Sequence, residues 1–278
     1  MKKIIVAFDG LNFSQSAMDY AVFFAKHSKA ELVGVFLDDF MNHSYNLSDI
    51  LHEEGGISDQ RLKLLNSEDE QIKDIAAQLF EDACVDEGLK FKVHRDKNVA
   101  LQELLHESIY SDLLIIDKKE DFSVHHHDAP TEFLRDLLAK VHCPVLVVPG
   151  KYMKIDEIVL LYDGEPASVQ AIKMFSYTLP VFDKKRIEVL TVKSDQESNH
   201  VPDGKLMREF ISGRYPAADF VIERGNAKKQ IFEYLHGRQS NSMVVTGAYT
   251  RGVVSRLLKP SMADYLIKEL DVPVFIAH

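Results

Sequence analysis

The chain repeats one series of short apolar segments twice, and this repeat restricts its fold more than any other feature. Residues 3–10 read KIIVAFDG and residues 157–164 read EIVLLYDG. Both are rich in β-branched residues and end in Asp-Gly, the pattern of a buried strand leading into a turn. Four further segments recur in the same order, so five strands are predicted in each half. These pairs are ELVGVFLDD (31–39) with IEVLTVKSD (187–195), FKVHRD (91–96) with FVIERG (220–225), DLLIID (112–117) with SMVVTG (242–247), and HCPVLVVPG (142–150) with DVPVFIAH (271–278).

Helical patterns lie between these strands. After the first strand, for example, Ala17, Ala21 and Ala25 recur at the spacing of one helix face. Strands that alternate with helices predict βαβ units, with a parallel sheet covered on both faces. We therefore expect an α/β fold of two tandem doubly wound, mainly parallel five-stranded domains. They would span residues 1–150 and 151–278, which suits a chain of 278 residues.

The two halves differ in length between their second and third strands. Asp9 precedes its counterpart Asp163 by 154 residues, whereas Pro144 precedes Pro273 by 129. The first half therefore carries 25 extra residues, within the excursion from 38 to 88 that contains an acidic helical run. Two interpretations stay open: a lid or interface element, or a surface insertion without a function.

Charge and composition exclude several classes of protein. The sequence has 33 Lys and Arg against 43 Asp and Glu, a formal net charge of −10, which argues against a general nucleic-acid binder. It has no run of about 18 apolar residues, and its first residues are too poor in apolar side chains for a signal peptide. Cys84 and Cys143 suggest neither a disulfide framework nor a zinc site. We expect a cytoplasmic protein that binds neither nucleic acid nor membranes.

The segment after the fourth strand of the second half reads GAYTRGVVSRLLKPSMADYLIKELDVPVFIA (247–277). It resembles the C-terminal signature of the universal stress protein family, in which a strand leads into G-x2-G-x9-G-[ST], a helix and a strand that opens with Cys-Pro-Val or a relative. The first half is similar in HCPVLVVPG, in Asp9 and in the helix of residues 14–25. The chain thus resembles a tandem universal stress protein.

The resemblance implies an architecture and a general role. Both halves would have the adenine nucleotide α-hydrolase-like fold, and their closing strands, residues 144–148 and 273–277, would meet in an intramolecular pseudo-dimer. It implies a stress-response or regulatory binding protein, with an unknown protein partner, rather than an enzyme. A further homodimer is left open.

The resemblance also implies a site at the end of the sheet. In nucleotide-binding members, loop glycines and a helix N-terminus hold the triphosphate, an Asp after the first strand lies beside the ribose or metal, and a residue near the end of the second strand contacts adenine. Carried over, this implies ATP with Mg in the second half. The residues would be Asp163, Val192, Gly247, Thr250 and Ser261, and Asp9 would be the first-half counterpart of Asp163.

Two departures weaken the second-half loop. Thr250 and Pro260 stand at the second and third glycine positions. Threonine reaches positive φ less readily than glycine, and proline has no N–H to donate to phosphate. Arg251, Arg256 and Lys259 supply positive charge nearby. Nucleotide binding by the second half is therefore left open.

The first half departs further. At an offset of 129, the four loop positions hold Lys118, Asp121, Thr131 and Glu132, with no glycine and two carboxylates that would repel a triphosphate. We expect no ATP there. For Asp9 and Asp163 a second interpretation stays open, because Asp after a strand commonly accepts backbone N–H bonds in turns and at helix starts.

The run His125-His126-His127 could hold a metal. Adjacent histidines in one loop rarely face one centre, so we expect a solvated loop and no metal. No phosphate loop, H-E-x-x-H or G-x-S-x-G motif occurs, so no catalytic residue is predicted. Two alternatives stay beside the binding protein: a nucleotide-hydrolysing switch, and an interaction module whose sites have decayed.

Overall fold

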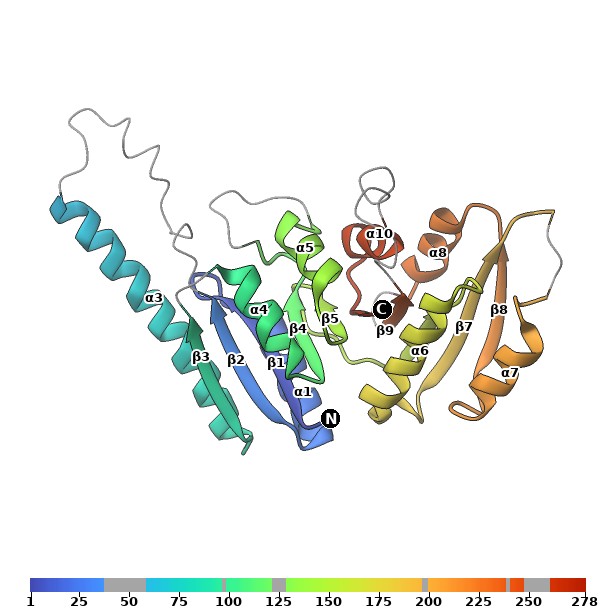
Figure 1. Ribbon diagram of the computed structural model, residues 1–278, viewed down its shortest axis with the longest axis horizontal. Coiled ribbons are helices and arrows are strands. Elements are labelled where there is room, and N and C mark those ends of the chain that lie inside the picture. Colours follow the sequence, from blue (N-terminus) through green and yellow to red (C-terminus); the bar gives the residue numbers. More distant parts are fainter. Residues whose placement is uncertain (38–58, 97–98, 122–128, 197–199, 239–240, 248–260) are drawn as a thin grey trace, which may run out of the picture.

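The computed structural model describes residues 1–37, 59–96, 99–121, 129–196, 200–238, 241–247 and 261–278. These residues form a ten-stranded sheet in the order β3-β2-β1-β4-β5-β10-β9-β6-β7-β8 (Figure 1). The elements of the first half are β1 (Lys3–Asp9), α1 (Gln15–Ser28), β2 (Glu31–Leu37), α3 (Asp59–Asp86), β3 (Phe91–Asp96), α4 (Ala100–Ile109), β4 (Leu113–Asp117), α5 (Glu132–Lys140) and β5 (Val145–Val148). Those of the second half are β6 (Glu157–Leu161), α6 (Pro166–Thr178), a 3-10 turn (Pro180–Phe182), β7 (Arg186–Lys193), α7 (Gly204–Ser212), β8 (Asp219–Arg224), α8 (Ala227–His236), β9 (Ser242–Gly247), α10 (Met262–Glu269) and β10 (Val274–Ala277).

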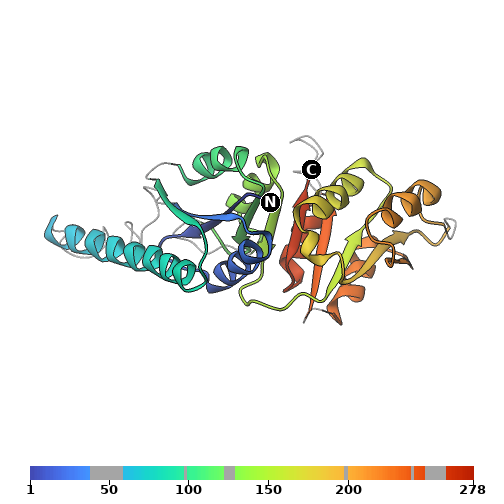
Figure 2. The same cartoon turned by 90° about the horizontal axis from the view of Figure 1, so that it is seen from below.

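The predicted α/β fold is confirmed. Within each half, neighbouring strands run parallel, and the strand order of the second half mirrors that of the first. The closing strands β5 and β10 meet in the middle and pair antiparallel, with Val147 opposite Val274. Helices cover both faces: α1, α3, α6 and α7 contribute to one apolar core and α4, α5, α8 and α10 to the other (Figure 2).

Both cores continue across the junction between the halves. On one face, the ring of Phe24 in α1 lies 5.8 Å from that of Phe182 in the second half. The segment that joins the halves is held by Tyr20, whose hydroxyl donates to the Met153 carbonyl and accepts from its N–H. Among the described helices, none combines the length and the apolar composition that a membrane-spanning helix requires.

The excursion of the first half ends in a long helix. Residues 38–90 join β2 to β3, whereas residues 194–218 join β7 to β8, so the first connection is 28 residues longer, against the 25 predicted. Helix α3 has 28 residues where α7 has nine, and it runs outward past the edge strand β3 (Figure 1). Phe80 anchors it over Gly34, where a Cβ atom would lie only 2.9 Å from the ring. Residues 38–58 lie outside the described part.

Candidate functional site

The predicted second-half residues lie along one edge of the sheet. Because β6, β7 and β9 are parallel neighbours, their carboxyl ends share an edge. Asp163 follows β6, Val192 lies at the end of β7, Gly247 ends β9, and Ser261 precedes α10. Thr250 lies outside the described residues. In a doubly wound sheet, this is the edge at which ligands bind.

The carboxylate of Asp163 is exposed and stabilises the turn that leads into α6. Its Oδ1 accepts a hydrogen bond from the backbone N–H of Glu165 at 3.0 Å and another from the Ser168 hydroxyl at 2.8 Å. This is the helix-start chemistry that the sequence left open as an alternative to a ligand contact. Because Asp163 is exposed, it can accept these hydrogen bonds and also contact a ligand.

Gly247 packs directly against the backbone of α6. A Cβ atom at this position would lie 2.5 Å from the carbonyl oxygen of Ala167 and 3.0 Å from the backbone nitrogen of Ser168. Contacts this short require glycine, since backbone atoms cannot move aside as a flexible side chain can. The first turn of α6 therefore explains this glycine without a phosphate.

Ser261 closes the N-terminus of α10 with a capping box. Its Oγ accepts from the backbone N–H of Asp264 at 3.1 Å, and Asp264 Oδ2 accepts from the N–H of Ser261 at 3.0 Å. Two donors of this helix terminus are thus satisfied within the chain. The carboxylate of Asp264 also places negative charge at the positive end of the helix.

Val192 is half-buried and packs against the core formed with α8 and α10. Its neighbour Thr191 points to the opposite face of β7 and is buried, and its hydroxyl has no hydrogen-bond partner in the described part of the chain. Sequence reasoning missed Thr191, because the hydroxyl of a buried threonine normally has a hydrogen-bond partner.

Strand register corrects the comparison of the two halves at this edge. Ile4 pairs with Leu113, and its counterpart Ile158 pairs with Met243, which sets fourth-strand equivalents 130 residues apart. The helix caps Thr131 and Ser261 also differ by 130. The offset of 129, which holds for Pro144 and Pro273, was therefore one residue short at this loop, whereas the pairing of segments 112–117 and 242–247 already has the offset of 130.

With this register, Asp117, Glu120 and Thr131 are the counterparts of Gly247, Thr250 and Ser261. Lys118, Asp121 and Glu132 are not the equivalents that the sequence offset indicated. Lys118 instead reaches the second half, where its Nζ donates to Asp271 Oδ1 at 2.6 Å and to the Leu270 carbonyl at 3.3 Å.

Three buried carboxyl groups occupy the first-half edge. Asp9, Asp117 and Glu120 are each 5–6% exposed. Glu120 Oε2 accepts from the backbone N–H of Asp9 at 3.2 Å, and Asp117 Oδ2 accepts from the Ser14 hydroxyl at 2.6 Å. Burial, together with the nearby Asp9 and Asp117, raises the pKa of Glu120 well above its usual range, which favours the neutral form of this carboxyl group. An anionic phosphate is disfavoured here.

Metal binding at these carboxyl groups lacks support. Within the described ranges, no group of three His, Cys, Asp or Glu residues is arranged to hold a metal ion. The run His125–His127 falls outside those ranges, so the expectation of a solvated loop stays a prediction.

The raised pKa of Glu120 predicts a pH-dependent effect of Glu120→Gln. At a pH above the ordinary pKa of 4.5, the Glu120 carboxyl group loses its proton in the unfolded chain but keeps it in the folded chain. Ionisation therefore stabilises the unfolded chain, and the free energy of unfolding of the wild type falls as the pH rises. Glutamine cannot ionise. The variant should therefore gain stability over the wild type by an amount that grows with pH up to the folded-state pKa, measured by urea unfolding across a pH series.

The exposed Glu132 supplies the control. Glu132→Gln makes the same substitution at the start of the following helix and should show no such growing difference. A stability difference for Glu120→Gln that stays constant with pH would contradict a protonated Glu120.

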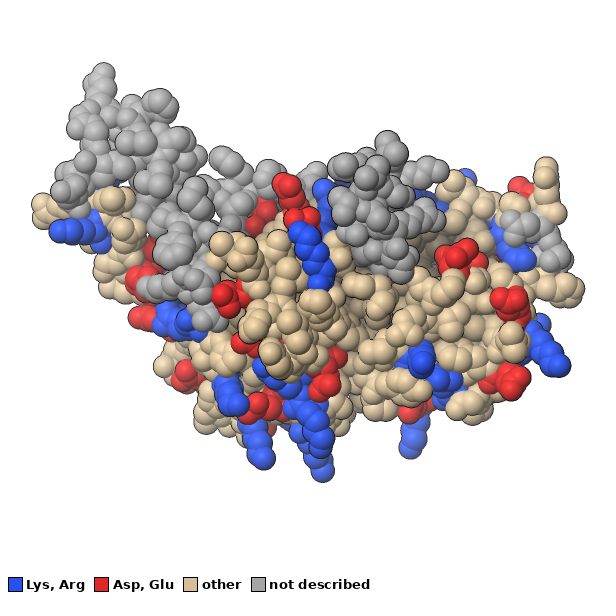
Figure 3. Space-filling view, viewed as in Figure 1, with Lys and Arg blue, Asp and Glu red and all other residues tan. Residues whose placement is uncertain are grey.

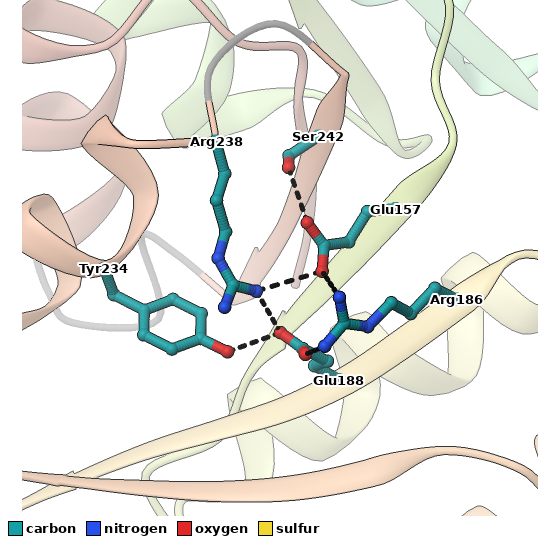
Figure 4. Close-up of polar contacts among 6 residues, drawn as sticks. All are labelled: Glu157, Arg186, Glu188, Tyr234, Arg238 and Ser242. Atoms are coloured by element: carbon teal, nitrogen blue, oxygen red, sulfur yellow. Dashed lines mark hydrogen bonds and ion pairs between the residues drawn. The ribbon is translucent and has the colours of Figure 1, made fainter.

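A second polar cluster lies near the opposite edge of the second-half sheet (Figure 4). Glu188 is buried in β7 between Arg186 and Arg238, each with a nitrogen 2.6 Å from one of its oxygens, and Tyr234 donates to it. Glu157 at the start of β6 accepts from Arg238 at 2.9 Å and from Ser242 at 3.1 Å. All four carboxylate oxygens have partners, so we assign the cluster a structural role. Sequence reasoning missed it, although a glutamate inside an apolar strand was a usable signal.

Comparison with known proteins identifies the fold. No family model matches the chain, and no curated protein sequence matches it. Among solved structures, a universal stress protein from Archaeoglobus fulgidus DSM 4304 superposes with a TM-score of 0.65 at 15% identity, covering 99% of this chain and 95% of that one. The chain has the universal stress protein fold.

Two proteins from Pseudomonas aeruginosa share this fold over the same length. A putative universal stress protein from strain UCBPP-PA14 gives a TM-score of 0.62 at 16% identity, covering 99% of this chain and 92% of that one. A functionally unknown protein from strain PAO1 gives 0.62 at 15% identity with the same coverage. The likeness thus extends over both halves of the chain.

Proposed function

We propose that the chain is a tandem member of the universal stress protein family, a regulatory binding protein of the stress response that binds an adenine nucleotide through its second half alone. Residues 1–150 and 151–278 would be its two domains, joined as an internal pseudo-dimer through β5 and β10. A cytoplasmic location belongs to the proposal, because Cys84 and Cys143 are free and buried, which suits a reducing compartment.

The asymmetry between the two edges is the observation that carries the proposal. The first half has buried Asp117 and Glu120 where the second half has Gly247 and Thr250. Residues 248–260 include three cationic side chains and no acidic one, whereas residues 118–130 include three acidic side chains against two lysines. A triphosphate is therefore electrostatically more favoured at the second edge than at the first.

The second-half residues fit ATP with Mg in part. The exposed Asp163 is the residue that would meet a ribose hydroxyl or a metal ion, and the half-buried Val192 is the residue that would face the base. The capping box at Ser261 leaves fewer helix donors for phosphate, so the cationic side chains of 248–260 would have to supply most of the attraction.

A second candidate function is an interaction module without a nucleotide. Contacts within the chain account for Gly247 and Ser261, because α6 fills the space beside one and Asp264 satisfies the other. This candidate function predicts the same fold, with a second-half edge that binds no nucleotide.

Asp163→Asn is expected to weaken Mg-ATP binding by roughly tenfold, since it removes the exposed charge that would face metal or ribose. Asparagine retains an Oδ1 atom that can accept the hydrogen bonds from Glu165 and Ser168, so folding should be preserved. Isothermal titration calorimetry measures the affinity, and nucleotide released on denaturing the purified protein identifies the ligand.

Asp9→Asn is the matched control, because Asp9 holds the equivalent position in the first half. It should leave the affinity unchanged. A protein that releases no nucleotide and shows no heat of binding with millimolar Mg-ATP would eliminate the nucleotide proposal and leave the interaction module.

A further inference from the structure

The extra helix α3 presents two different faces. Its inner face packs on the sheet and α1 through Ala76, Ala77, Phe80 and Cys84, all buried. Phe80 lies against the rings of Phe8, Phe36 and Phe91. These contacts fix the rotation of the helix about its axis, so the side chains on its other faces have fixed directions.

A second stripe on α3 is apolar and exposed in its central part. Ile72, Ile75 and Leu79 are 40%, 60% and 48% exposed. The stripe follows a spacing of alternating four and three residues through the helix, the heptad pattern of helices that pair with helices. Its positions are Arg61, Leu65, Glu68, Ile72, Ile75, Leu79, Asp82 and Asp86. Exposed apolar side chains gathered in this way mark an interaction surface.

The charges at the two ends of the stripe determine which partner fits. The outer end carries Arg61 and the inner end carries Asp82 and Asp86, and Figure 3 shows basic side chains at the outer end of this helix and acidic ones further along. A second α3 in the opposite direction places Arg61 beside Asp86 and Ile72 beside Ile75. A parallel copy would instead place like charges together at both ends. An antiparallel pair also aligns the helix dipoles favourably.

We propose that α3 pairs with α3 of a second copy of this chain, in an antiparallel contact centred on Ile72 and Ile75. The contact is isologous and closes as a twofold dimer. Its energy comes from the two central contacts between Ile72 and Ile75, since exposed ion pairs add little and Leu79 lies beside Glu68 of the other copy. One helix pair buries less than the usual ~1,600 Å² of a stable interface, so the dimer is transient and depends on concentration.

Sedimentation velocity over a concentration series tests the dimer. The average mass should rise from that of one chain toward two, and Ile75→Glu should raise the dissociation constant by about tenfold or more by placing a charge at the centre of the contact. Leu206→Glu is the matched control, because Leu206 is 66% exposed on α7, the helix that replaces α3 in the second half. It should leave the dissociation constant unchanged.

Cysteine cross-linking tests the direction of pairing independently of that variant. In the proposed register Glu68 lies beside Leu79 of the other copy, so a mixture of Glu68→Cys and Leu79→Cys proteins should form disulfide-linked dimers more efficiently than either alone. A wild type that stays monomeric at every concentration, or Leu79→Cys alone linking as well as the mixture, would overturn the proposal.

Discussion

Replacing Gly247 with alanine is expected to lower the free energy of unfolding by about 3 kcal/mol, because the added methyl group has no space. Its Cβ atom would lie 2.5 Å from the Ala167 carbonyl oxygen, a backbone atom at the start of α6. Relief requires α6 to move away from β9, which loosens the core on that face. Urea unfolding followed by circular dichroism measures the loss.

Gly237→Ala is the control for this prediction. Beyond Gly237 and its two chain neighbours, no atom of the described residues lies within 4 Å of a Cβ atom at this position, and its φ of −72° suits any residue. This variant should be as stable as the wild type or slightly more stable. Equal stability of the two variants would show that α6 does not pack on β9 as described. The prediction also means that lost nucleotide binding in a Gly247 variant is no evidence of a phosphate contact, which is why Asp163→Asn is the sharper probe.

Replacing Arg238 with methionine is expected to lower the free energy of unfolding by about 3 kcal/mol. Arg238 pairs with both Glu157 and Glu188, and the Glu188 side chain is only 2% exposed. Arg238 and Tyr234 both contact the same oxygen of Glu188. Without Arg238 this oxygen has no cation beside it, whereas Arg186 remains beside the other oxygen. Chemical denaturation at neutral pH measures the effect.

A surface pair on the same face gives the comparison. Lys229 and Glu233 lie 3.8 Å apart in α8 and are both largely exposed, so Lys229→Met should change stability by less than about 0.5 kcal/mol. The double variant Glu188→Leu with Arg238→Met should lose less than Arg238→Met alone if the unpaired buried charge causes the damage. A double variant that is less stable than Arg238→Met would contradict this cause.

The strands and their positions along each half were predictable because buried parallel strands are continuously apolar, and the Asp-Gly, Cys-Pro-Val and Val-Pro-Val segments mark where they begin and end. The meeting of β5 with β10 followed from the resemblance rather than from the residues. What apolar patterning could not determine was exact register. The segment pairing of 112–117 with 242–247 aligns Asp117 with Gly247, whereas the offset of 129 aligns Lys118 with it, and the hydrogen-bonded strand pairs decide for Asp117.

The placement of the candidate site residues at one edge was predictable, but their contacts were not. Sequence placed Asp163, Gly247 and Ser261 at one edge, yet their partners Ser168, Ala167 and Asp264 depend on how α6 and α10 dock. The buried Glu120 was missed because a charged residue in a loop is normally assigned to solvent. Its burial arises from Asp9 and Thr131, which are distant in sequence and adjacent only in the fold.

The antiparallel junction of β5 with β10 joins two halves of one polypeptide, and this has a consequence for how such a molecule can change. In a dimer of identical chains, every substitution appears twice, so a carboxylate that closes one site closes both. Within a single chain, Asp117 and Glu120 arise on one side only while Gly247 is retained on the other. Covalent linkage also keeps the two halves together at any dilution. In a fused chain, one half can therefore have a purely structural role while the other half keeps the capacity to bind a ligand.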